Sequence, residues 1–159
     1  MKNNIEKISL LIKNKKFSEA VDNLNNLDEN EKNNPNYYFL KGISYLYLNN
    51  ISAAIENFTQ CLELNSNNPT FYFYRGYTFS RLNDFEKTKE DYQKAISLKP
   101  NAPEFYNNLA GVYYTTGENE KAIEHYIKSL ELKKDLKPSL TGLLNVLSQT
   151  KKTNVRNSE

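Results

Sequence analysis

The sequence has little of what most catalytic and metal-binding sites are built from. It contains one cysteine, Cys61, and one histidine, His125, so it holds neither an internal disulfide framework nor a multi-cysteine metal site. Glycine-rich phosphate loops and the HExxH and GxSxG motifs are absent. We therefore predict that the chain is not an enzyme by itself and has no catalytic residue, metal site or cofactor.

The sequence also lacks an excess of charge of one sign and a long apolar run. The 21 basic and 19 acidic residues leave a formal net charge of +2, dispersed along the chain. This balance gives no electrostatic reason to expect a nucleic acid or an anionic membrane as a partner. No apolar stretch approaches the roughly 18 residues of a membrane helix or forms a signal peptide. The prediction is a soluble cytoplasmic chain with no nucleic-acid or membrane partner.

What the sequence does contain is a period of 34 residues, marked by Pro35, Pro69 and Pro103. Other columns keep one type of side chain at the same spacing: small at Gly42, Gly76 and Ala110, large at Tyr45, Phe79 and Tyr113, and mostly alanine at Ala20, Ala54, Thr88 and Ala122. The period divides the chain into units 1–34, 35–68, 69–102 and 103–136, without insertions. A period of this length is typical of solenoids, in which each unit buries its apolar face against the next.

Each unit is predicted to form two antiparallel helices. Asn34 and Asn68 precede prolines, which places a capping side chain before a proline at the first helical position. Apolar residues then recur at helical spacing in both halves of a unit. Turn-forming pairs separate the halves, and small residues such as Gly42 and Ala54 are expected to let the two helix backbones approach closely. The fold class predicted is an all-α solenoid of helix pairs.

The residues after the fourth unit predict one more helix, 138–149, with Leu140, Leu143, Leu144 and Leu147 on one face. Its other positions are largely polar, which suits a terminal cap. Residues 151–159 are polar and lack periodicity, so they are expected to be a disordered tail or linker. We predict one domain that spans residues 1–150.

These units resemble tetratricopeptide repeats. The consensus of that family has a large residue at repeat position 4, a small one at 8, aromatic residues at 11 and 24, alanine at 20 and a small residue at 27. The fourth unit matches it with Tyr106, Ala110, Tyr113, Ala122, Tyr126 and Ser129. The first unit matches least well, as is expected of a terminal repeat. The resemblance implies a right-handed superhelix.

The resemblance also implies a concave groove that binds a peptide and is lined by the first helix of each unit. The candidate contacts in this groove are Phe39, Ile43, Tyr47, Phe73, Tyr74, Tyr77, Arg81, Asn107, Asn108 and Tyr114. Phe39 and Phe73 fit a packing role as well as a binding role, whereas Tyr74, Tyr77 and Arg81 are the better candidates for contact. A partner with apolar or aromatic side chains suits such a surface.

One known ligand of the family is not expected here. The clamp that binds the acidic tails of heat-shock chaperones would fall on uncharged residues: Ile5, Ser9, Leu40, Thr70 and Tyr74. Three readings of function remain open. The chain is a scaffold or adaptor that binds a protein segment, the N-terminal non-catalytic array of a larger transferase, sulfotransferase or hydroxylase, or a module that associates with its own copies.

Overall fold

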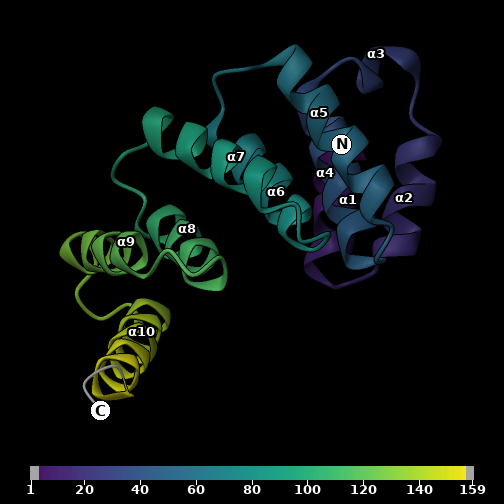
Figure 1. The fold of residues 1–159 in the computed structure, drawn as a ribbon. Coiled ribbons are helices and arrows are strands. Elements are labelled where there is room, and N and C mark those ends of the chain that lie inside the picture. The colour runs from purple at the N-terminus through teal and green to yellow at the C-terminus, as the bar shows by residue number, and fades with distance from the viewer. Residues whose placement is uncertain (1–3, 157–159) are drawn as a thin grey trace. The chain divides into compact units, whose positions relative to one another are not determined.

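The computed structural model describes the backbone of residues 4–156 and the side chains of residues 4–151. Within that range it has ten helices and no strand (Figure 1). The helices are α1 (Asn4–Lys13), α2 (Phe17–Asn25), α3 (Glu29–Lys32), α4 (Pro35–Tyr47), α5 (Ile51–Leu64), α6 (Pro69–Ser80), α7 (Phe85–Leu98), α8 (Pro103–Thr115), α9 (Asn119–Leu132) and α10 (Lys137–Arg156). The all-α prediction is confirmed. No helix in this range is long and apolar enough to cross a membrane.

The chain divides into two compact units, Met1–Asn83 and Asp84–Glu159. The first unit holds α1 to α6, and the second holds α7 to α10. The division falls inside the third sequence repeat, between its two helices. The single domain expected over residues 1–150 stays a prediction.

Helix starts follow the local sequence signals. The helices α4, α6 and α8 each begin at one of the periodic prolines. The side chain of Asn34 accepts a hydrogen bond from the backbone nitrogen of Tyr37 at 3.1 Å, and Asn68 accepts one from Thr70 at 2.9 Å. Both residues cap a helix as predicted. Ala102 precedes α8 and supplies no such cap.

The turn within each repeat is fixed by one residue with left-handed backbone. Lys15, Asn49, Asn83 and Gly117 have φ values of 60°, 61°, 58° and 82°. They lie 34 residues apart. Glycine and asparagine tolerate this conformation, whereas other residues pay roughly 1–2 kcal/mol for it because Cβ meets the following carbonyl oxygen. Lys15 is therefore the strained member of this column.

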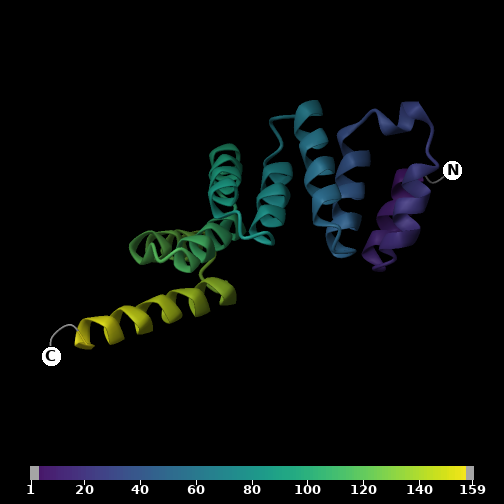
Figure 2. The same ribbon diagram turned by 45° about the vertical axis from the view of Figure 1, so that its right-hand side comes forward.

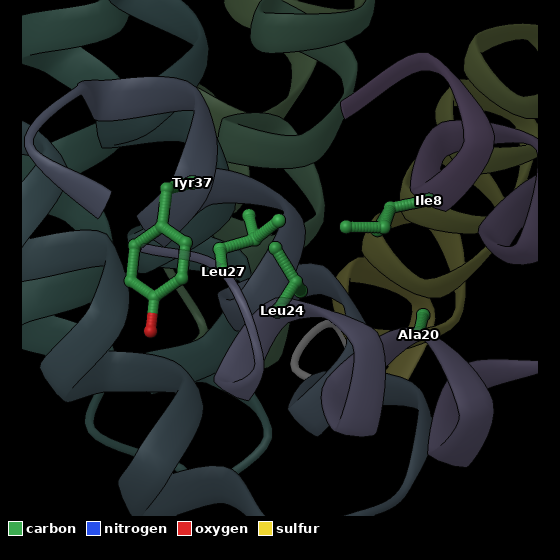
Figure 3. Packing of buried hydrophobic residues seen from close by; sticks show 5 residues of the cluster. All are labelled: Ile8, Ala20, Leu24, Leu27 and Tyr37. Carbon is green, nitrogen blue, oxygen red and sulfur yellow. The ribbon is translucent and has the colours of Figure 1, made fainter. Parts of the chain in front are cut away.

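The core of the first unit is built from the helix faces that the periodicity predicts. Figure 3 shows one cluster, in which side chains from α1, α2, the segment after α2 and α4 gather: Ile8, Ala20, Leu24, Leu27 and Tyr37. A second cluster joins α4 to α5 through Ile43, Leu46, Ala54 and Phe58.

Gly42 makes room for an aromatic ring. A Cβ atom at Gly42 would lie only 2.8 Å from Cε1 of Phe58. Phe58 is fully buried, and its ring centroid lies 6.0 Å from that of Phe39 and 5.9 Å from that of Tyr74. The absence of a side chain at Gly42 therefore permits an aromatic core in the second repeat.

Polar contacts join the helices of the second unit. Gln93 on α7 donates a hydrogen bond to the hydroxyl of Tyr113 on α8 at 3.0 Å. Ser129 on α9 donates to the carbonyl of Pro103 at 2.8 Å and lies 2.8 Å from the hydroxyl of Ser139 on α10. The contact between Ser129 and Ser139 holds α10 against α9.

Two elements differ from the sequence prediction. The short helix α3 was not predicted; Asp28 caps it by accepting a hydrogen bond from the backbone of Glu31 at 2.9 Å. The last helix, at the yellow end of the chain in Figure 2, continues to Arg156, beyond the predicted end at residue 149 and into the expected tail. Residues 157–159 of that tail lie outside the described residues.

Glu118, the residue just before α9, is expected to make the fold less stable as the pH falls into the acid range. It accepts hydrogen bonds from Lys121 at 2.7 Å, Thr116 at 2.9 Å and Lys89 at 3.1 Å, which lower the pKa of its carboxyl group from 4.5 to about 2. Since this pKa is lower in the folded state, the stabilisation is complete above about pH 5 and is lost as the pH falls towards 2.

The measurement is urea unfolding at pH 5.5 and at pH 2.5 for the parent and for Glu118→Gln. The parent should lose more unfolding free energy between the two pH values than the variant does. Equal losses would show that these hydrogen bonds do not favour the ionised carboxylate.

Candidate functional site

A pocket in the first unit brings together several of the predicted groove residues. Its volume is about 440 Å³. It lies where the turn between α1 and α2 meets α4 and α6, and it is lined by Ile12, Lys13, Lys15, Phe17, Ile43, Tyr47 and Tyr74. The lining is mostly aliphatic and aromatic, with two lysines.

Aromatic rings form the walls of this pocket. The ring of Tyr47, the last residue of α4, stacks on that of Phe17 with a centroid distance of 4.7 Å and an interplanar angle of 6°. Tyr47 is nevertheless 65% exposed, so its other ring face is available to a ligand. Tyr74 is half-buried, and burial raises the pKa of its hydroxyl group. One wall is therefore open to solvent and the other is anchored in the core.

The two lysines give the pocket a positive rim. Within the described residues, the side chains of Lys13 and Lys15 are exposed and make no ion pair. The neighbouring Lys16 differs, because its ammonium group binds Glu19 at 3.0 Å. The pocket can therefore accept an apolar group that lies next to a carboxylate or a carbonyl oxygen.

The other predicted residues of the first unit divide into core and surface. Ile43 is only 7% exposed and belongs to the core beneath the pocket. Phe39 packs against Phe71 with ring centroids 5.5 Å apart, and the half-buried Phe73 meets Tyr74 edge to face at 5.5 Å.

Tyr77 and Arg81 are exposed, as a contact residue must be. Arg81 already donates a hydrogen bond to the side-chain oxygen of Asn49 at 3.1 Å. A ligand that used its guanidinium group would have to share it with this turn.

The three candidates in the second unit, Asn107, Asn108 and Tyr114, all lie on α8. The amide oxygen of Asn107 accepts a hydrogen bond from Ser139 at 2.9 Å. Asn108 donates to the carbonyl of Glu104 at 2.7 Å, one turn earlier in α8. Tyr114 is half-buried. Both asparagine side chains therefore have partners inside their own unit.

Sequence reasoning missed four residues that line the pocket: Ile12, Lys13, Lys15 and Phe17. A signal existed for two of them. Ile12 and Lys13 lie 34 residues before Leu46 and Tyr47, so the repeat spacing relates Lys13 to the predicted groove residue Tyr47 and places Ile12 beside it. Nothing in the repeat pattern pointed to Lys15 or Phe17.

The cysteine offers no reactive centre. Cys61 is fully buried and its thiol donates a weak hydrogen bond to the carbonyl of Pro35 at 3.4 Å. Burial raises the pKa of the thiol to about 12, so the thiolate is scarce at neutral pH. In the described part of the chain, no three His, Cys, Asp or Glu side chains gather in a way that would hold a metal ion.

Two family models match the sequence of the chain. The model described as tetratricopeptide repeat matches residues 35–68 and 103–136, which coincide with the second and fourth sequence repeats. The model described as TPR repeat matches residues 81–117. Together they cover more than half of the chain, and the chain belongs to the tetratricopeptide repeat family. The search of curated proteins found no match to this chain.

Solved structures share the fold at low sequence identity. The MamA protein superposes with a TM-score of 0.81 at 20% identity, over 91% of this chain and 79% of that one. A thermophilic TPR protein of Thermus thermophilus gives 0.77 at 17% identity, over 91% and 79%. The first TPR domain of Spaghetti, bound to an HSP90 peptide, gives 0.71 at 20% identity, over 73% and 92%.

Proposed function

We propose that this chain is a protein–protein interaction module, and that its first unit binds a large apolar or aromatic side chain of a peptide or protein segment. The observation that carries this proposal is the 440 Å³ pocket in which the open ring of Tyr47 faces the same space as Tyr74 and Ile12. Rigid aromatic side chains bury much apolar area on binding at a small cost in conformational entropy.

The charge of the rim adds to this preference. Lys13 and Lys15 favour a segment with a carboxylate beside its apolar anchor. The solved TPR domain of Spaghetti holds an HSP90 peptide, which supports a peptide as the kind of ligand. The chaperone tail itself is not proposed, because the uncharged residues Ile5, Thr70 and Tyr74 stand at the clamp positions that hold lysine or arginine in arrays that bind such tails.

A random-peptide library displayed on phage tests this proposal. Selection on the parent chain should enrich peptides with a large apolar or aromatic residue, and Tyr47→Ala should weaken the binding of a selected peptide about tenfold, a loss of roughly 1–2 kcal/mol. Fluorescence anisotropy of the labelled peptide measures the affinity.

The matched control is Leu82→Ala, which truncates another exposed apolar side chain of the first unit, one that lies outside the pocket. It should leave the affinity unchanged. Selected peptides without an apolar anchor, or equal losses in the two variants, would refute the pocket as the binding site.

A further inference from the structure

Helix α10 exposes an apolar stripe with a lysine at each end. Leu140, Leu144 and Leu147 are 42%, 66% and 40% exposed. Residues spaced by three and four lie on one helix face, and Lys137 and Lys151 continue the same spacing before and after the leucines. Helix α10 contains no acidic residue, and neither of these two lysines forms an ion pair within the described residues.

Helix α9 exposes a second apolar stripe, and a glutamate lies at each end of this stripe. Ile123 and Ile127 lie at helical spacing between Glu120 and Glu131, and Ile127 is 44% exposed. These residues line a pocket of about 430 Å³ together with Tyr106, Glu124, His125 and Lys128. Glu131 binds Lys128 at 2.9 Å, whereas Glu120 and Glu124 make no ion pair within the described residues.

The preceding repeat shows how such a face is normally covered. Ala110 and Tyr113 on α8 occupy the positions equivalent to Leu144 and Leu147. They are 0% and 5% exposed, because α9 packs over them. Within residues 4–156, no later helix follows α10 to cover the leucines in the same way.

We propose that the leucine stripe of α10 in one copy of this chain packs on the isoleucine stripe of α9 in a second copy. From Lys137 to Lys151 the first stripe is about 21 Å long, and from Glu120 to Glu131 the second is about 16 Å long. Leucines then meet isoleucines, and the long lysine side chains reach the glutamates at both ends in either helix direction.

Charge selects this pairing over its alternatives. Two α10 stripes placed together would bring lysines against lysines, and two α9 stripes would bring glutamates against glutamates. Like charges that face each other weaken an interface, whereas the mixed pairing sets lysines against glutamates at both ends, with Glu131 shared between Lys128 and the incoming lysine. Each contact thus joins α10 of one copy to α9 of the other. In a symmetric dimer the same contact forms twice, once in each direction.

Light scattering over a concentration series tests the proposal on the full chain. The mass of the parent should rise from monomer towards dimer, and it should fall again at high salt. The variants Leu144→Ser and Ile127→Ser should each weaken dimerisation at least tenfold, whereas Leu82→Ser, in the first unit, should leave it unchanged. Circular dichroism checks that all three variants remain helical.

Mixing the two defective variants is the decisive measurement. The Leu144→Ser chain keeps an intact α9 face and the Ile127→Ser chain keeps an intact α10 stripe, so a mixture restores one undamaged contact. Dimers should therefore form in the mixture at concentrations at which neither variant dimerises alone. A parent that stays monomeric, dimers that neither variant weakens, or a mixture without restored dimers would overturn the proposal.

Discussion

Replacing Phe58 with alanine should lower the free energy of unfolding by about 3–5 kcal/mol. The ring of Phe58 is fully buried and packs from α5 against the rings of Phe39 on α4 and Tyr74 on α6. Removing it takes away its transfer free energy and leaves a cavity that the surrounding rings cannot refill, because each is held by its own helix. Urea unfolding followed by circular dichroism gives the size of the loss.

Tyr47→Ala is the matched control for Phe58→Ala. Tyr47 is also an aromatic residue in the same repeat, but it is 65% exposed, so its truncation should cost at most about 1 kcal/mol. If both variants lost the same unfolding free energy, the aromatic cluster around Phe58 could not be the core of the first unit.

Alanine at Gly142 should destabilise the second unit by about 1–3 kcal/mol, while alanine at Gly111 should stabilise it by about 0.5–1 kcal/mol. Both glycines are helical and both face the same side chain, Tyr126. A Cβ atom at Gly142 would overlap the ring of Tyr126, whereas one at Gly111 would lie 3.7 Å from its hydroxyl oxygen, an ordinary contact. Tyr126 is 5% exposed and has little room to move away.

Urea unfolding of the two variants measures both effects against the parent. The opposite signs are the informative result, because the gain in helix propensity is the same for the two substitutions. A stabilised Gly142→Ala would show that α10 can shift away from α9 without loss of packing.

The helix pairs were predictable from the sequence because their signals are local and repeated. Proline at the first helical position and asparagine before it act within one turn of helix, as Asn34 and Pro35 show. The core residues followed from periodicity alone, since Ala54 and Phe58 lie on the face that the spacing selects.

The candidate site was less predictable, because exposure depends on neighbours that are distant in the sequence. Ile43 is one of the residues predicted to line the groove, yet it is buried by contacts with the helices around it. Asn107 is another, but its amide oxygen accepts a hydrogen bond from Ser139, which lies 32 residues later in the chain. No pattern within a single repeat predicts either contact.

The left-handed backbone of Lys15 sets the stability of the fold against the binding proposed for this position. Glycine there would relieve the strain that the Cβ atom of lysine creates, and asparagine would tolerate the same φ at less cost, as it does at Asn49 and Asn83. Either replacement would remove one of the two charges on the rim of the pocket. An effort to select more heat-resistant versions of this chain would therefore favour substitutions that discard part of the ligand preference proposed for the pocket.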